Sequence, residues 1–259
     1  MVITKFQNRL DELFSTRKQG ILSVFYTAGF PRLDDTVRIA RELEQAGADM
    51  IEIGIPFSDP IADGPVIQHS NTIAVGNGIT LSTIFRQVEV IRNTVQLPIV
   101  LMGYLNPVIQ FGMELFVSEC SRTGVDGVIL PDLPLDEYLA RYQELFGQHR
   151  VYLSFLITPT TPPDRIRLLD EFSSGFIYAV AASGTTGARA LFSADQLTYF
   201  QQLKDINLKN PFLIGFGISN QATFREACRY GAGAIVGSAF IQALSENKQI
   251  DKYIKSMRS

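Results

Sequence analysis

Short apolar runs alternate with amphipathic segments along almost the whole chain. The apolar runs have strand length and are rich in β-branched and aromatic residues; they cover residues 21–27, 49–54, 98–104, 125–131, 150–157, 175–181, 211–217 and 233–238. Segments with apolar residues at helical spacing follow these runs, at 34–46, 65–75, 80–94, 107–124, 135–147, 162–172, 193–204, 219–231 and 239–256. One more helix is predicted over 4–18, before the first strand. In the helix over 219–231, Ser219 is the expected N-cap. The pattern predicts eight strand–helix units behind an opening helix.

Strands that are apolar throughout are typical of a parallel sheet covered by helices. Eight such units in 259 residues most simply close into a single (β/α)₈ barrel, or TIM barrel, with an extra N-terminal helix. An open doubly wound sheet is the alternative, but no GxGxxG follows the first strand, where its dinucleotide site would lie. No break in composition divides the chain, so we expect one domain over residues 1–259.

Composition and charge narrow the possible classes of protein. The formal net charge is -3 and no run of Lys or Arg occurs, which argues against a nucleic-acid partner. Cys120 and Cys228 are too few and too far apart for a disulfide framework, and a reducing cytoplasm is the natural compartment. No apolar run reaches the roughly 18 residues that span a bilayer, and the N-terminal segment lacks a signal-peptide core. We therefore expect a cytoplasmic enzyme without a membrane segment.

After its first residue, Asp49, the strand at 49–54 carries one ionisable residue, Glu52. Because strand side chains alternate, Glu52 faces away from Ile51 and Ile53. Burying a carboxyl is costly unless it is paired or functional, and barrel chemistry lies at the carboxyl ends of the strands. We interpret Glu52 as a catalytic acid or base with a raised pKa. A structural pair with a Lys or Arg is the alternative.

The loop after this strand, PFSDPIADGP, contributes two further acids. On residue type alone, turn or capping roles explain both Asp59 and Asp63. Pro56 and Phe57 are apolar in an otherwise polar loop, which fits either a partner contact or burial under a neighbouring loop.

Glycines at the ends of the last two strands, in GFGIS and GSAF, occupy the usual phosphate position of such barrels. Tight turns alone are the alternative. The segment SGTTGAR (183–189) has the composition of a loop that closes over a substrate. Tyr104 and Tyr178 stand near strand ends, where they either flank a planar ligand or pack in the core.

Two kinds of catalytic group are missing from the predicted strands. No Lys lies on any of them, so a Schiff-base mechanism has no nucleophile. The two histidines, His69 and His149, lie away from the strand ends, so a histidine-ligated metal site is not expected. Acid–base chemistry must therefore rest on carboxylates, with help from tyrosines.

The chain resembles the tryptophan synthase alpha subunit family in six segments that occur in the family's order. They are IEIGIPFSDPIADGPVIQ, PIVLMGYLNPV, DGVILPDLP, SGTTGAR, GFGIS and GAIVGSAF. The first is long and nearly gapless, which makes the resemblance specific. It implies a (β/α)₈ barrel that cleaves indole-3-glycerol phosphate to indole and glyceraldehyde 3-phosphate.

The resemblance also implies roles for individual residues. Glu52 matches the acid–base residue that acts at C3 of the indole and at the glycerol hydroxyl, and Asp63 matches the residue that holds and deprotonates the indole nitrogen. The matched substrate contacts are Tyr178 near the catalytic acid, Tyr104 and Phe216 as pocket walls, and Thr186 as a lid residue that meets Asp63. The matched phosphate contacts are Gly187, Gly217, Gly237 and Ser238. Ala182 departs from the family, where many relatives carry a larger polar residue.

A partner is implied as well. The family's alpha subunit forms an α₂β₂ heterotetramer with a PLP-dependent beta subunit and passes indole to it. Pro56 and Asp59 match the loop that contacts this partner, and the PLP belongs to the beta subunit, so no cofactor or metal is expected in this chain. Two alternatives remain: another phosphate-binding barrel, such as a sugar-phosphate isomerase, and a non-catalytic activator of the beta subunit. Retention of both Glu52 and Asp63 counts against the activator.

Overall fold

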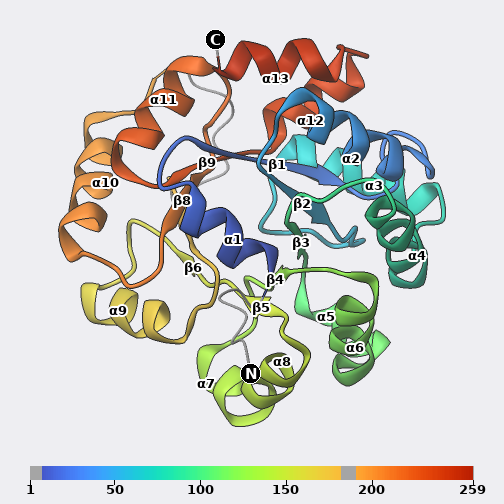
Figure 1. Cartoon of the computed structure of the whole chain (residues 1–259), viewed down its shortest axis with the longest axis horizontal. Coiled ribbons are helices and arrows are strands. Elements are labelled where there is room, and N and C mark those ends of the chain that lie inside the picture. Colours follow the sequence, from blue (N-terminus) through green and yellow to red (C-terminus); the bar gives the residue numbers. More distant parts are fainter. Residues whose placement is uncertain (1–7, 182–190, 259) are drawn as a thin grey trace.

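The computed structural model describes residues 8–181 and 191–258, and its strands form a ring surrounded by helices (Figure 1). All strand pairs are parallel, and neighbours follow the order β5-β4-β3-β2-β1-β9-β8-β7-β6. The strands are β1 (Ile21–Thr27), β2 (Met50–Gly54), β3 (Ile99–Met102), β4 (Gly127–Ile129), β5 (Tyr152–Leu153), β6 (Leu156–Ile157), β7 (Ile177–Val180), β8 (Phe212–Gly215) and β9 (Gly233–Val236).

The ring closes through one stretch of chain, because only Ser154 and Phe155 separate β5 from β6. β5 pairs with β4, and β6 pairs with β7. Ser154 N–H donates to the carbonyl of Val128 on one side at 3.1 Å, and Tyr178 N–H donates to the carbonyl of Phe155 on the other at 3.0 Å. The strand predicted at 150–157 is thus one interrupted barrel strand. The predicted (β/α)₈ barrel is confirmed, and the open doubly wound sheet is excluded.

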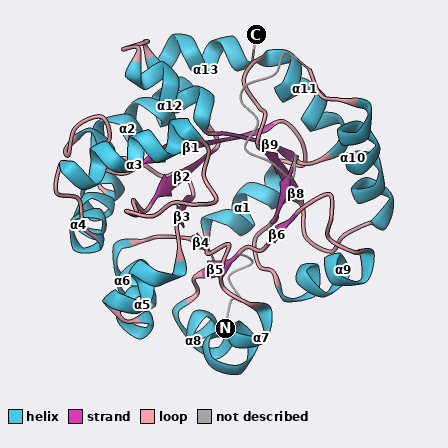
Figure 2. Ribbon diagram, turned by 180° about the vertical axis from the view of Figure 1, so that it is seen from behind, coloured by secondary structure: helices cyan, strands magenta, loops and turns pink. Residues whose placement is uncertain are grey.

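Helices cover the outside of the barrel, as the view from behind makes plain (Figure 2). They are α1 (Arg9–Thr16), α2 (Asp35–Ala46), α3 (Pro65–Gly76), α4 (Leu81–Arg92), α5 (Leu105–Phe111), α6 (Met113–Thr123), α7 (Leu135–Glu137), α8 (Gln143–His149), α9 (Pro163–Phe172), α10 (Ala194–Ile206), α11 (Gln221–Tyr230), α12 (Ser238–Ser245) and α13 (Ile250–Arg258). Gly47 and Gly124 end α2 and α6 with φ values of 93° and 87°, the left-handed conformation that suits glycine. No helix in these described ranges is both long and apolar enough to cross a membrane.

Three predicted helices differ from the structure. The helix expected over 107–124 breaks at Gly112, whose φ of 95° cannot continue a helix, so α5 and α6 are separate. The tail expected as one helix over 239–256 is α12 and α13, with Asn247 in the left-handed region (φ 54°) between them. The helix over 135–147 contains a π-helical turn (η1, Tyr138–Tyr142) and runs on to His149.

One capping prediction was also wrong. Asn220, not Ser219, is the N-cap of α11, because Asn220 has the extended backbone of a cap (φ -156°) and its side chain accepts the N–H of Thr223 at 2.9 Å.

The apolar interior consists of two separate clusters. The larger lies between the outer face of the barrel and the helices, while the smaller fills the barrel itself. α1 crosses one end of the barrel (Figure 1) and contributes buried Leu10 and Phe14 to the inner cluster, where the Phe14 and Phe176 rings lie 5.9 Å apart. α1 therefore closes the amino-terminal end of the barrel, which leaves the carboxyl ends of the strands for a site.

Candidate active site

A cavity of about 280 Å³ lies at the carboxyl ends of the strands. Seven residues that the sequence analysis singled out line it: Asp63, Tyr104, Tyr178, Phe216, Gly217, Gly237 and Ser238. Apolar side chains from four other strand ends complete much of its wall, namely Phe25, Met102, Leu156 and Ile235. The cavity thus combines a broad apolar surface with a few polar groups, as small-molecule sites do.

Glu52 is fully buried on the inward face of β2. Its Oε1 accepts a hydrogen bond from the Ser23 hydroxyl at 2.8 Å, and its Oε2 has no hydrogen-bond partner within the described residues. Burial raises the pKa of Glu52 to about 8, against which the Ser23 hydrogen bond acts weakly. No cation of the described chain pairs with it, so the expected alternative of a structural ion pair is not observed there.

The carboxyl of Glu52 is not itself on the cavity wall. Glu52 precedes the wall residue Gly54 by two positions, so both face the barrel interior, with Glu52 deeper. Tyr178, which is buried and lines the cavity, connects the two acids electrostatically. Burial and then the charges of Glu52 and Asp63 raise the pKa of Tyr178 well above its ordinary value. The phenol therefore stays protonated beside the cavity.

Asp63 lies just before α3 and is half-buried. Its side chain is hydrogen-bonded to the Tyr104 side chain and to Asn71, whose Nδ2 donates to Oδ2 at 3.5 Å. Burial raises the pKa of Asp63 to about 6, although these bonds act in the opposite direction. The Tyr104 hydroxyl also accepts the N–H of Ala62 at 3.1 Å, and burial together with the charge of Asp63 raises the pKa of Tyr104 to about 12. The carboxyl is thus held in place by neutral partners.

The end of β8 is shaped around Tyr178. A Cβ at Gly215 would lie 2.2 Å from the Tyr178 hydroxyl, so only glycine fits there. Phe216 and Gly217 follow with left-handed φ values of 68° and 79°, a conformation costly for phenylalanine and frequent at functional sites. This turn brings the Phe216 ring against Tyr178, with centroids 6.2 Å apart and an interplanar angle of 76°.

The part of the cavity wall formed by Gly217 and the start of α12 suits an anion. Gly237 precedes α12, so Ser238 and Ala239 place the first turn of a helix on the cavity wall, and Gly217 lies there as well. Exposed N–H groups and the helix dipole attract negative charge at such a terminus. Among the described residues that line the cavity, none is Lys or Arg, so this lining offers an anion no cationic side chain.

Comparison with known proteins agrees with this arrangement. A family model described as tryptophan synthase alpha chain matches residues 12–258. The tryptophan synthase alpha chain of Parabacteroides distasonis is 49% identical over 255 residues, which cover 97% of this chain and 99% of that protein. The same protein of Phocaeicola vulgatus is 49% identical over 257 residues, covering 97% and 100%. The chain belongs to the tryptophan synthase alpha chain family.

Solved structures of the family have the same fold. Tryptophan synthase subunit alpha of Legionella pneumophila superposes with a TM-score of 0.86 at 32% identity, and the match covers 97% of each chain. A chain of Mycobacterium tuberculosis tryptophan synthase superposes with a TM-score of 0.88 at 30% identity, again over 97% of each.

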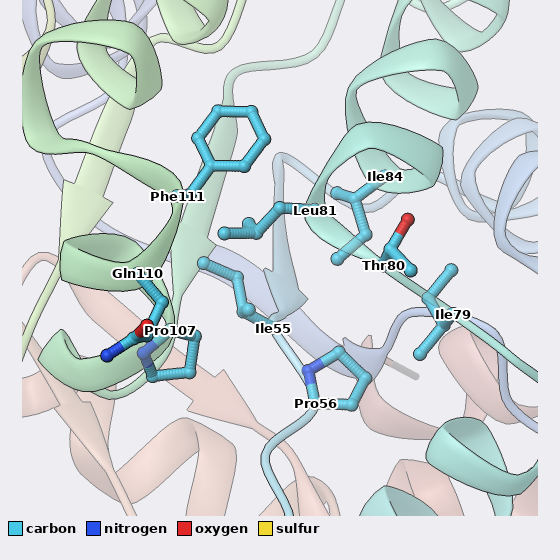
Figure 3. A pocket seen from close by; sticks show the side chains of 9 residues that line it. All are labelled: Ile55, Pro56, Ile79, Thr80, Leu81, Ile84, Pro107, Gln110 and Phe111. Carbon is cyan, nitrogen blue, oxygen red and sulfur yellow. The ribbon is translucent and has the colours of Figure 1, made fainter.

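The other residues that the family resemblance singled out either lie outside the described residues or line no part of this cavity. Thr186, Gly187 and the rest of the segment 183–189 lie outside the described residues. Pro56 lines a second cavity of about 310 Å³ between the start of α4 and α5, with Pro107 among the other lining residues (Figure 3). Asp59 is exposed, and the Phe57 ring packs 5.3 Å from that of Tyr104. Phe57 is therefore partly buried, as the second interpretation of this loop expected.

Two polar residues of the site escaped the sequence analysis, although each carries a signal. Asn71 is buried in α3, eight residues after Asp63, which two turns of helix bring back beside the start of the element. Ser23 is the one polar inward position between Ile21 and Phe25. A polar residue at a buried position of a regular pattern was the clue in both cases. No group of three or more His, Cys, Asp or Glu in the described chain is arranged to hold a metal ion.

Proposed function

We propose that this chain cleaves indole-3-glycerol phosphate to indole and glyceraldehyde 3-phosphate by a retro-aldol reaction, as one barrel domain over residues 1–259. The observation that carries the proposal is the pair of carboxyls with raised pKa values, Glu52 and Asp63, whose charges both act on Tyr178 of the cavity wall. An aromatic apolar cavity for indole and a helix N-terminus for phosphate support it.

Glu52 is the proposed acid–base residue. With a pKa of about 8 it holds a proton at neutral pH, which it gives to C3 of the indole ring. The resulting indolenine accepts the electron pair of the breaking bond between C3 and the first glycerol carbon. The hydroxyl on that carbon becomes a carbonyl, and its proton returns to the Glu52 carboxylate. No electron sink other than the substrate is needed.

Asp63 is the proposed partner of the indole nitrogen. Its carboxylate, positioned by Tyr104 and Asn71, takes up the N–H proton as positive charge develops on the ring, and returns it to the nitrogen when the bond at C3 breaks, which gives indole. Phe216 and Tyr104 form walls for the planar ring, while Gly217, Gly237 and Ser238 receive the phosphate. Thr186 and Gly187 keep their proposed roles in the lid and the phosphate grip from the family resemblance alone.

The proposed partner is a beta subunit that contains PLP, joined in an α₂β₂ heterotetramer in the cytoplasm. Similarity to chains of the Mycobacterium tuberculosis tryptophan synthase supports this assignment. Exposed Asp59 and half-buried Pro56 lie in the loop beside the cavity and are the proposed contacts. Indole released at Asp63 would leave the chain on this side.

The decisive experiment measures indole release from indole-3-glycerol phosphate by the purified chain, alone and with a beta subunit. We expect release in both cases, faster with the partner. No release in either case would contradict the proposal. Turnover of an aminated sugar phosphate instead would favour the isomerase, and stimulation of a beta subunit without any cleavage would favour the activator.

An Asp63→Asn variant tests the second carboxyl. We expect kcat to fall by about 10²- to 10⁴-fold, the usual worth of a general acid or base, with a smaller change in phosphate affinity. Asp205→Asn is the matched control, since Asp205 is an exposed acid in α10 at the opposite end of the barrel. Normal turnover in Asp63→Asn would remove Asp63 from the mechanism.

A further inference from the structure

Ser23 is a polar side chain in a part of the molecule built from apolar ones. It is fully buried, and its strand neighbours on the same face, Ile21 and Phe25, belong to the inner cluster of the barrel. A buried hydroxyl without a partner costs about 1–3 kcal/mol, so a serine here needs a hydrogen bond. Within the described residues, the Ser23 hydroxyl donates to Glu52 Oε1 at 2.8 Å and to no other side chain.

This bond makes the two oxygens of Glu52 unequal. Oε1 accepts from Ser23, whereas Oε2 is buried and has no hydrogen-bond partner in the described chain. A protonated carboxyl places its hydrogen on the oxygen that is not accepting a strong bond, because the accepting oxygen carries the carbonyl character. The hydroxyl also restrains a side chain with three rotatable bonds, which burial alone does not orient.

We propose that Ser23 is the positioning residue of Glu52: its hydroxyl anchors Oε1 and leaves Oε2 as the oxygen that carries the exchanged proton. This inference rests on the proposed acid–base role of Glu52. Removing the hydroxyl removes both the anchor and a bond that favours the ionised form, so Glu52 becomes harder to ionise and less well aimed.

The titrating groups around Glu52 can be separated by pH. Tyr178 on β7 faces it and stays protonated, because its pKa is well above the ordinary value. Asp63, in the loop between β2 and α3, interacts through Tyr178 and has a pKa of about 6, lower than the value of about 8 for Glu52. The two carboxyls therefore titrate at different pH values, and a shift of the higher titration midpoint alone reports on Glu52.

The test compares Ser23→Ala, Ser23→Thr and a control, Ser154→Ala. Ser154 is likewise a buried serine with its side chain toward the barrel interior, but its hydroxyl donates to the carbonyl of Ser174 at 3.1 Å. The carboxyl midpoint of Glu52 is measured by infrared difference spectroscopy, with a Glu52→Gln sample to assign the band. We expect Ser23→Ala to raise the midpoint by roughly 0.5–1 pH unit, about the worth of one hydrogen bond.

The same shift should appear in the pH profile of kcat, with kcat lowered by about 10-fold and KM nearly unchanged. Ser23→Thr keeps the hydroxyl and should restore the midpoint, while Ser154→Ala should leave it where it is in the unaltered chain. Thermal unfolding of each variant separates these effects from a loss of folded protein.

An unmoved Glu52 midpoint in folded Ser23→Ala, or a shift of equal size in Ser154→Ala, would overturn the inference. The spectroscopic readout does not depend on turnover. If the unaltered chain releases no indole, the proposed function fails, yet the midpoint still decides whether Ser23 governs Glu52. If it releases indole but Ser23→Ala has unchanged kcat and midpoint, only the role of Ser23 fails.

Discussion

Two buried acids in the barrel have opposite surroundings. Asp126, 2% exposed, stands before β4 at the amino-terminal end, where Arg92 Nη2 lies 2.6 Å from one oxygen and Arg9 Nη1 lies 3.1 Å from the other. The N–H of Ile99 donates to it as well, at 2.9 Å. Glu52, 0% exposed, has one neutral hydroxyl and no cation among the described residues. The two acids are thus equally buried but differ in whether a cation pairs with them.

The difference lies in what each acid is tied to. Arg92 also donates to the backbone carbonyls of Gly124, Val95 and Leu97, so the Asp126 cluster joins the turns that lead into β3 and β4. Its charge is neutralised, and it lies at the end of the barrel that α1 covers, away from the cavity. Glu52 is left uncompensated next to a cavity, which holds a proton on it at neutral pH. An ion pair with arginine makes Asp126 a structural residue, whereas Glu52, without such a pair among the described residues, can exchange a proton.

The largest effect is expected from Glu52→Gln. Cleavage should fall by about 10²- to 10⁴-fold or more, because the amide cannot transfer a proton, while the protein still folds and binds substrate. Single-turnover indole release and substrate binding are the measurements. Near-normal turnover would contradict the contrast between the two acids, since Glu52 would then be a structural residue like Asp126.

Asp126→Asn should act on stability instead. It leaves Arg92, whose side chain is only 10% exposed, without its anion, and breaking such a pair typically costs about 3–5 kcal/mol. The measurement is the free energy of unfolding in urea, with kcat determined on the folded protein. A large fall in kcat with unchanged stability would contradict the division of roles.

The pH dependence of stability gives a third test. A carboxyl with a higher pKa in the folded state costs nothing below its unfolded pKa near 4.5, and the cost grows until pH passes the folded pKa of about 8. Glu52→Gln removes this cost, so the stability gained over the unaltered chain should grow between these two pH values and reach on the order of 5 kcal/mol at pH 9. Urea unfolding at pH 5 and pH 9 measures it. An equal difference at both pH values would mean that the pKa of Glu52 is not raised.

The smallest effect is expected from Arg9→Ala. The Arg9 side chain is 37% exposed, so water screens its pair with Asp126 and the loss should be about 0.5–1 kcal/mol. The free energy of unfolding in urea, measured for Arg9→Ala and Asp126→Asn side by side, compares the two losses directly. A loss as large as that of Asp126→Asn would mean that Arg9, and not Arg92, neutralises the buried acid.

Most of the fold could be predicted because its signals are local. The strand at 21–27 was predicted to the residue, and the helices predicted to end at 46 and 124 do end where Gly47 and Gly124 adopt the left-handed backbone. The errors arose where one residue changes a backbone that the apolar pattern does not report. Gly112 and Asn247 each divide a segment whose hydrophobic spacing continues across the break.

The site was predicted less evenly. Glu52 was found from the residues alone, since an acid on an inward face of a strand contradicts the pattern around it. Asp63 needed the family resemblance, because an aspartate before a proline-initiated helix is explained equally well by a turn. Burial in the folded barrel raises its pKa, and the hydrogen bonds that hold its carboxyl come from Tyr104 and Asn71 on other elements.

By itself, the sequence determined the eight units, the inward direction of Glu52 and the family, because periodicity and ordered motifs are properties of the chain alone. The tertiary structure decided which groups meet. Barrel closure through Ser154 and Phe155 and the bond between Ser23 and Glu52 depend on contacts between residues distant along the chain. The same holds for the lack of a cation near Glu52 among the described residues. A carboxyl's pKa follows from that surrounding volume, so only the folded barrel distinguishes Glu52 from Asp126.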